Sequence, residues 1–206
     1  MRVLNANDPR VDNLVSVKLP GNLAMVYSIR INENHASFIT KEMARDFGYD
    51  LEKVYDAAEI NTPKLMPATF ESLDHAILVL PEDRATLDNI EDNLSSQVFI
   101  LSNKTNIYGA SALFYPGTTK KIAEIIGDDF YAIPSSLHEF MICPASLNNP
   151  VYLEDVLVGA NATVVKPEDV LGDKVLYCNA AENYISIANP DFKVISNEID
   201  NDFEIE

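Results

Sequence analysis

The sequence predicts an α+β fold, with an antiparallel or mixed sheet that carries its helices mainly on one face. Short runs rich in branched and aromatic residues occur in pairs, and turn-forming residues separate the members of each pair. Stretches with an apolar residue at every third or fourth position lie between these pairs and indicate amphipathic helices. Strands joined by hairpins favour an α+β fold over the strict strand–helix alternation of a doubly wound fold.

The first pair of strands is predicted at residues 22–31 and 35–39. The earlier run, NLAMVYSIRI, is rich in branched and aromatic side chains. The residues between the two runs, Asn32 to Asn34, are turn formers. These three segments together predict a hairpin.

Two helices are predicted after this hairpin. Thr40 can cap a first helix that runs to Phe47, and Gly48 can end it in a left-handed conformation. Asp50 can cap a second helix, which Pro63 is expected to end. The second helix has one apolar stripe, formed by Leu51, Val54, Tyr55 and Ala58.

The middle of the chain combines a strand, a helix and a polar stretch. Residues 68–73 favour a strand and residues 74–80 a helix. Residues 81–96 are polar and acidic with widely spaced apolar groups, which is typical of a linker or an exposed loop.

The length of 206 residues fits one domain or two small ones. The acidic stretch at 81–96 divides an N-terminal α+β subregion, residues 1–80, from a C-terminal α+β subregion, residues 97–190. Residues 191–206 form an acidic tail. We expect these parts to make one globular unit, because a chain of this size can bury a core without metals or crosslinks.

The second half of the chain is predicted to alternate strands with helices. The strands are expected at residues 97–101, 108–115, 129–133, 138–143, 174–178 and 184–187. Thr118 or Thr119 can cap a helix that Gly127 ends, after a turn at Pro116–Gly117. Asn149 can cap the last helix, which has a proline at its first position.

The balance of charges is unusual for a chain of otherwise average composition. It has 32 acids and 15 bases, with a net charge of −17. The net charge of residues 1–60 is −2, so residues 61–206 carry most of the acidity. A nucleic-acid binder needs the opposite sign, and we expect no nucleic-acid partner. An acidic surface keeps a protein soluble and suits a partner with a basic surface.

Several classes of site are not predicted. The seven glycines form neither GxGxxG nor GxxxxGK[ST], so no nucleotide cofactor is expected. The three histidines and two cysteines lack the spacing of zinc ligands, so no metal is expected. No apolar run has the length of a membrane span, and no signal peptide is recognised. We therefore expect a cytoplasmic protein with reduced thiols and no membrane partner.

One cluster of residues suggests chemistry: Ser135, Ser136, His138 and Glu139. In a regular strand Ser136 and His138 share one face, whereas Ser135 and Glu139 share the other. A serine beside a histidine is the arrangement of a nucleophile and its base, and a carboxylate can orient the ring. In the alternative interpretation, residues 134–136 are a turn and His138 satisfies a polar group where a strand begins.

Seven short motifs follow one another along the chain: Glu59–Pro63, Leu101–Asn103 with Tyr108–Ala110, Tyr115–Gly117, Pro134–Ser136 with His138–Glu139, and Asn161–Leu171. In this order and at this spacing they resemble the bacterial family of unknown function DUF5688, from about Arg2 to Ile187. Members of that family usually carry an extra N-terminal region, and a Ser–Asp pair where Gly172–Asp173 stands here. The resemblance implies a bacterial protein, of the kind found in gut anaerobes and their mobile elements, and implies no activity.

Three functions are left open by the sequence. The first is a non-enzymatic protein-binding module, regulatory or anti-defence, with a protein partner that has a basic surface. The second is a hydrolase or transferase that uses the cluster at residues 135–139. The third is a small-molecule sensor with a pocket between sheet and helices. Enzymatic activity and the oligomeric state are not predicted.

Overall fold

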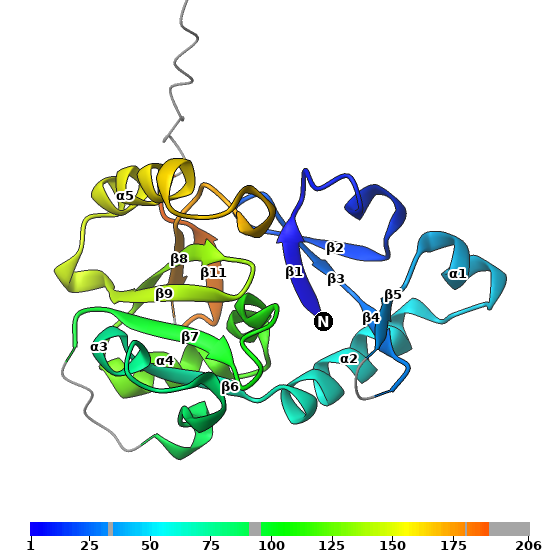
Figure 1. Ribbon diagram of the computed structural model, residues 1–206, viewed down its shortest axis with the longest axis horizontal. Coiled ribbons are helices and arrows are strands. Elements are labelled where there is room, and N and C mark those ends of the chain that lie inside the picture. The colour runs from blue at the N-terminus through cyan, green and yellow to red at the C-terminus, as the bar shows by residue number, and fades with distance from the viewer. Residues whose placement is uncertain (33–34, 91–95, 180, 190–206) are drawn as a thin grey trace, which may run out of the picture.

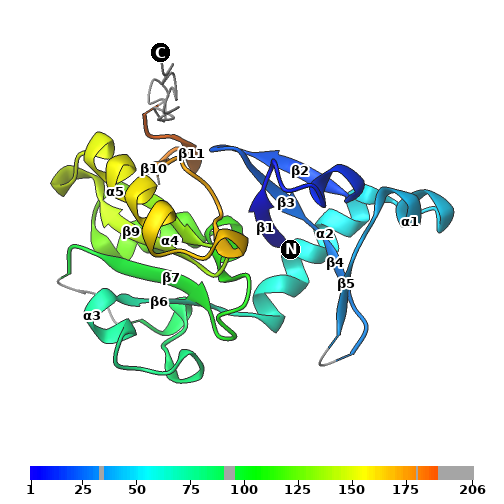
Figure 2. The same cartoon turned by 45° about the horizontal axis from the view of Figure 1, so that its top comes forward.

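Two lobes lie side by side in both views of the ribbon (Figures 1 and 2). The N-terminal lobe contains the elements between Arg2 and Leu65, and the C-terminal lobe those between Ala68 and Ile187. The computed structural model describes residues 1–32, 35–90, 96–179 and 181–189.

The N-terminal lobe is built on a three-stranded antiparallel sheet, whose strand order is β1–β3–β2. Its strands are β1 (Arg2–Asn5), β2 (Ser16–Leu19) and β3 (Leu23–Val26). Tyr27 separates β3 from β4 (Ser28–Arg30), which pairs with β5 (Ala36–Phe38). The hairpin predicted here is confirmed, although the strand predicted at residues 22–31 is two strands. Residues 33 and 34 of its turn lie outside the described residues.

Helices α1 (Lys41–Asp46) and α2 (Leu51–Leu65) begin at the predicted caps. The side chain of Thr40 accepts a hydrogen bond from the Met43 N–H, and Asp50 accepts one from Lys53. Gly48 has a φ of 61°, as a left-handed helix end requires. The prediction that Pro63 ends α2 is wrong, because the helix continues to Leu65. A proline in the last turn removes one N–H donor, and the helix tolerates that loss there.

The C-terminal lobe contains a six-stranded antiparallel sheet, with the strand order β11–β10–β8–β9–β7–β6. Its strands are β6 (Ala68–Ser72), β7 (Phe99–Asn103), β8 (Phe130–Ser136), β9 (Glu139–Pro144), β10 (Leu176–Asn179) and β11 (Tyr184–Ile187). The predicted α+β class is therefore confirmed, and the sheet is antiparallel.

Helices cover both faces of this sheet, whereas the sequence favoured mainly one. Helix α5 (Pro150–Thr163) packs Leu153 and Leu157 against Ile133 and Cys143. Helix α4 (Thr118–Ile126) belongs to the main core, as do Ala132 of β8 and Ile142 of β9. Successive residues of a strand point to opposite faces, so these helices lie on opposite sides. The apolar residues on both faces of β8 and β9 require this arrangement.

The acidic stretch predicted as a linker or loop is packed where the structure describes it. Helix α3 (Leu73–Ala76) is shorter than the helix predicted at residues 74–80. Two 3₁₀ turns follow it, and Leu87 of the second is 4% exposed. Arg84 makes an ion pair of 3.2 Å with the buried carboxylate of Glu71 on β6. Residues 91–95 lie outside the described residues, and the predicted division into subregions stays a prediction.

The strand predicted at residues 108–115 is wrong. Residues Gly109–Phe114 form a 3₁₀ helix, η4, whose first five residues are buried. An apolar run that is buried on every side shows no alternation of apolar and polar residues. Its composition therefore did not distinguish a strand from a 3₁₀ helix. The caps predicted at Thr118 and Thr119 are also wrong, because Gly117 occupies the N-cap of α4. Gly127 ends α4 with a φ of 72°, as predicted.

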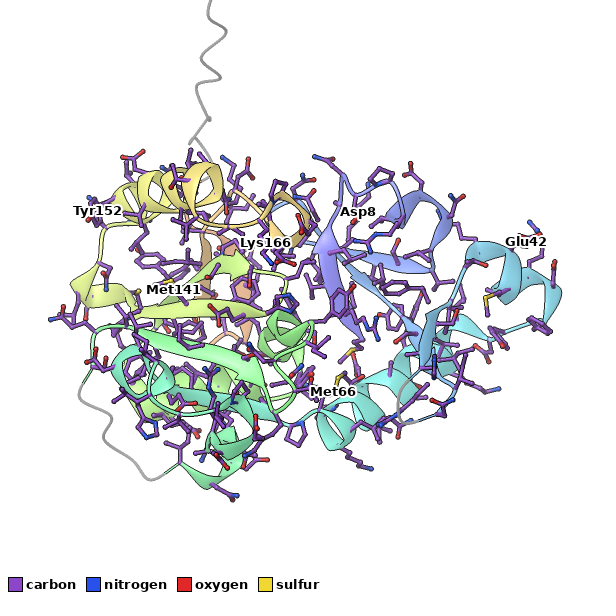
Figure 3. All side chains as sticks on the ribbon, viewed as in Figure 1. Asp8, Glu42, Met66, Met141, Tyr152 and Lys166 are labelled. Atoms are coloured by element: carbon purple, nitrogen blue, oxygen red, sulfur yellow. The ribbon has the colours of Figure 1, made fainter. Side chains whose placement is uncertain are left out.

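At two positions the lobes pack so closely that a glycine fits and a larger residue would be crowded. A Cβ atom on Gly21 would lie 2.8 Å from Leu176, and one on Gly172 would lie 3.2 Å from Leu23. Asn5 of β1 donates a hydrogen bond of 3.1 Å to the Leu171 carbonyl across the same junction. With side chains drawn, Met66 lies where α2 leaves the N-terminal lobe (Figure 3).

Candidate ligand-binding sites

The predicted cluster of Ser135, Ser136, His138 and Glu139 lies on the hairpin of β8 and β9. The interpretation of residues 134–136 as a turn is wrong, because β8 runs to Ser136 with an irregularity after Ile133. Ser135 Oγ donates a hydrogen bond of 3.3 Å to Glu139 Oε1. Ser136 Oγ accepts one of 3.1 Å from the backbone N–H of His138.

The imidazole of His138 has partners at both of its nitrogens. The backbone N–H of Tyr108 donates a hydrogen bond of 3.3 Å to Nδ1. Nε2 lies 3.3 Å from Asp169 Oδ1, so the neutral ring carries its proton there. Within the described residues no hydrogen bond joins this ring to Ser135, Ser136 or Glu139. The hydrolase hypothesis thus lacks a nucleophile–base pair in this geometry, and it stays a prediction.

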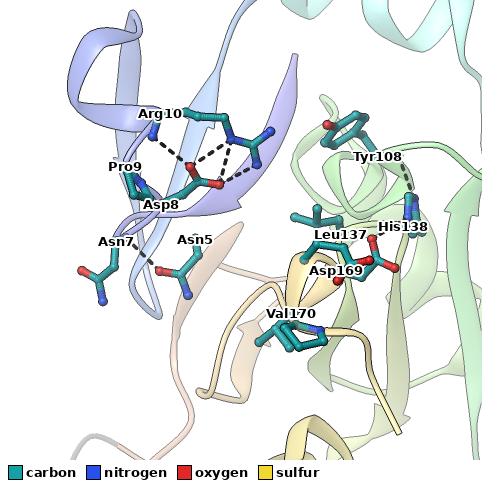
Figure 4. A pocket seen from close by; sticks show the side chains of 12 residues that line it. Asn5, Asn7, Asp8, Pro9, Arg10, Tyr108, Leu137, His138, Asp169 and Val170 are labelled. Carbon is teal, nitrogen blue, oxygen red and sulfur yellow. Dashed lines mark hydrogen bonds and ion pairs between the residues drawn. The ribbon is translucent and has the colours of Figure 1, made fainter.

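A cleft of about 780 Å³ opens between the lobes beside His138 (Figure 4). The described residues that line it are Asn5, Asn7, Asp8, Pro9, Arg10, Tyr108, Leu137, His138, Pro167, Glu168, Asp169 and Val170. Asp169 was not among the candidate residues, because it follows His138 by 31 positions and no local motif joins them. Only the fold brings this carboxylate to the ring.

The charges on the N-terminal side of the cleft neutralise each other. Asp8 Oδ2 lies 2.5 Å from Arg10 Nη2, and Asp8 Oδ1 lies 2.9 Å from Arg10 Nε (Figure 4). These hydrogen bonds hold the pKa of the Asp8 carboxyl below its usual range. They also raise the pKa of Arg10. Asp8 and Arg10 therefore face a ligand as a pair that is already formed.

Tyr108 has an uncommon backbone conformation, with a φ of 51°. The left-handed region is unfavourable for an aromatic residue and persists only where neighbours hold it. The hydrogen bond from its N–H to His138 is one such restraint. The guanidinium of Arg2 lies 4.6 Å from the centre of its ring and 5.0 Å from that of Phe38. Tyr108 thus lines the cleft and also a second hollow of the protein.

That second hollow is a groove of about 750 Å³ between the β4–β5 hairpin and α2. We call it the α2 groove. The described residues that line it are Met1, Arg2, Tyr27, Ser28, Ile29, Arg30, Asn32, His35, Ala36, Ile39, Val54, Ala57, Ala58, Asn61, Thr62, Leu65, Met66, Thr105, Ile107 and Tyr108.

The α2 groove is apolar with basic groups along its edge. Leu65 and Ile107 expose 50% and 56% of their surface to solvent at its sides. Desolvation by its surroundings raises the pKa of Tyr27 to about 12, with the charge of Glu59 as a smaller cause. None of the described residues that line it is Asp or Glu, in a chain with 32 acids. Sequence periodicity could not reveal this groove, because its walls come from four separate segments of the chain.

The family model for a family of unknown function, DUF5688, matches residues 5–179. The chain belongs to this family. The resemblance seen in the motifs is therefore confirmed, and it covers every residue that lines the cleft. Comparison with curated proteins finds no match, and the same is true of the solved structures.

The remaining features of this DUF5688 protein that could have indicated a function are its cysteines, its possible metal ligands and its helices. Cys143 and Cys178 are free and buried, and desolvation raises the pKa of the Cys143 thiol to about 11. In the part of the chain that the structure describes, no group of three or more His, Cys, Asp or Glu residues could hold a metal ion. No described helix has the length and apolar character needed to cross a membrane.

Proposed function

We propose that this DUF5688 protein is a non-enzymatic protein-binding module that takes a segment of a partner into the α2 groove. The observation that carries the proposal is the groove itself, an open and largely apolar hollow with a volume of about 750 Å³. Apolar surface that a monomer leaves exposed in one place marks an interaction site more often than scattered exposed residues do.

The shape of the groove supports a protein segment as the occupant. One wall is the helix α2 and the other is a two-stranded hairpin, so the hollow is bordered by two elongated elements. Ala57 and Ala58 leave room along the helix, and Ile29 supplies apolar surface opposite. Peptide segments bind such surfaces by placing a few apolar side chains along the groove.

The remaining functional expectations belong to this proposal as well. The cytoplasmic location and the regulatory or anti-defence role are consistent with a module that binds proteins. The acidity of residues 61–206 gives the rest of the surface its charge and keeps the module soluble. The basic partner expected from that acidity would bind elsewhere on the surface, whereas the groove requires a partner with exposed apolar residues.

Selection from a displayed library of random ten-residue peptides would test the proposal. We expect apolar peptides to be enriched and to slow amide hydrogen exchange in β4, β5 and α2. An Ala57→Gln substitution fills the groove from an exposed helix position, and we expect about tenfold weaker binding.

Asp56→Gln on the same helix is the matched control, because Asp56 is exposed and does not line the groove. It should bind the selected peptides as the unchanged protein does. The proposal fails if no peptide is enriched, or if Ala57→Gln and Asp56→Gln bind equally well.

A further inference from the structure

We infer that the partner segment carries acidic side chains, and that Arg2 binds one of their carboxylates at the Tyr108 end of the α2 groove. This inference rests on the proposed function and names the chemistry of the partner. It reverses the expectation drawn from net charge, since the groove selects an acidic segment although the protein itself is acidic.

Two aromatic rings hold the guanidinium of Arg2 in place. Its central carbon lies 4.6 Å from the centre of the Tyr108 ring and 5.0 Å from that of the Phe38 ring. The two rings meet edge to face, with their centres 6.4 Å apart. Contact with ring faces leaves the N–H groups at the rim of the guanidinium plane available for hydrogen bonds.

Arg2 differs from other arginines of the chain in its partners. Arg10, Arg45 and Arg84 each form an ion pair with a carboxylate, on Asp8, Asp46 and Glu71 respectively. Arg2 forms no ion pair with any of the residues that the structure describes. An arginine with no carboxylate partner among the described residues is open to one from outside.

The surroundings of Arg2 strengthen such a contact. A docked apolar segment would cover the groove and displace its water, and an ion pair is stronger where water is excluded. The described lining residues contain no carboxylate to compete for Arg2, and Glu59, whose charge acts on Tyr27, is not one of the lining residues. Arg30 and His35 lie on the same groove and add no negative charge.

Three sets of labelled ten-residue peptides, identical in their apolar positions, would test the inference by fluorescence anisotropy. The intervening positions would be Glu in the first set, Gln in the second and Lys in the third. We expect the Glu set to bind at least tenfold more tightly than the Gln set, and the Lys set to bind most weakly. Added salt should weaken binding of the Glu set.

The substitution Arg2→Met keeps an apolar side chain on the rings and removes the charge. We expect it to reduce the affinity of the Glu peptides to that of the Gln peptides. Arg45→Met is the matched control, because Arg45 is on α1, lies outside the groove and is exposed. Circular dichroism and the urea midpoint establish that both variants are folded.

The outcomes distinguish failure of the inference alone from failure of the proposed function. Equal binding of the Glu and Gln sets overturns the inference and leaves the binding module standing, and so does an Arg2→Met variant that still prefers Glu. Failure of all three sets overturns both. Dodecanoate would be tested in parallel as a fatty acid. If it binds and no peptide does, both the inference and the proposed function are overturned. An amidated form of the Glu set excludes the terminal carboxylate as the bound group.

Discussion

The cleft and the α2 groove have almost the same volume, about 780 and 750 Å³, and Tyr108 lines both. Their chemistry differs. In the cleft, Asp8 is paired with Arg10, and Asp169 lies 3.3 Å from Nε2 of His138. In the groove Arg2 faces apolar surface and aromatic rings. The comparison teaches that the partners of the lining groups indicate a binding surface better than the size of a hollow does. We therefore expect substitutions in the cleft to lower stability and substitutions in the groove to lower binding.

The largest effect is expected from Gly109→Ala, which disturbs the wall that the two hollows share. A Cβ atom there would collide with Ser102 Oγ and the His138 carbonyl oxygen, and would lie 2.9 Å from Asn103 N. Because two of these atoms are backbone, relief requires movement of β7 or the hairpin. We expect a loss of about 3 kcal/mol in the free energy of unfolding, measured by urea denaturation.

Gly159→Ala is the control for this substitution. A Cβ atom on Gly159 meets nothing within 4 Å, and the residue lies inside α5. Alanine should therefore stabilise the protein by about 0.5 kcal/mol. Equal stability of the two variants would contradict the packing described for Gly109.

A smaller loss is expected from His138→Leu. This change leaves the Tyr108 N–H and the Asp169 carboxylate without their partner, at a cost of about 1–3 kcal/mol. His138→Asn keeps an acceptor near the position of Nδ1, so we expect it to recover part of the loss. If His138→Leu were as stable as the groove variant Ala57→Gln, the distinction between the hollows would fail.

The smallest effect is expected in the pH dependence of the free energy of unfolding, to which Asp8 of the cleft contributes. The pKa of Asp8 is lowered in the folded protein, chiefly by its hydrogen bonds with Arg10. The stability that Asp8 contributes is thus present above its unfolded pKa, about 3.9, and is lost as the pH falls through the lower folded value. Because the pair is partly exposed, this contribution is below about 1 kcal/mol.

Asp8→Asn should therefore narrow the difference between urea midpoints at pH 7 and pH 3. The groove variant Ala57→Gln removes no carboxyl and should keep the full difference. A steeper pH dependence in Asp8→Asn than in the unchanged protein would show that the sign is reversed.

The sequence predicted the local structure well where a capping residue or a turn former had a local role. Thr40, Asp50 and Asn149 cap helices as expected, and Gly48 and Gly127 end them. These signals act over three or four residues, so they are visible in a single sequence.

Predictions failed where tertiary packing decided the structure. A strand was predicted at residues 108–115, yet residues 109–114 form a 3₁₀ helix, in which Gly109 packs closely against β7 and the β8–β9 hairpin. The cluster at residues 135–139 was visible in the sequence, but Asp169, the carboxylate beside His138, comes from a distant turn. The α2 groove was missed entirely, because Arg2, Phe38 and Tyr108 meet only in the folded chain.

The stacking of Arg2 on Phe38 and Tyr108 also provides a natural place for an optical reporter. The chain contains no tryptophan, so an indole introduced by Phe38→Trp would be its only one and could be excited at wavelengths that tyrosine does not absorb. Tryptophan binds a cation at its face more strongly than phenylalanine does, so Arg2 should stay in contact with the new ring. A carboxylate that binds Arg2 would change the electric field at the indole, and with it the wavelength and intensity of the emission, so the binding of a partner could be followed in real time.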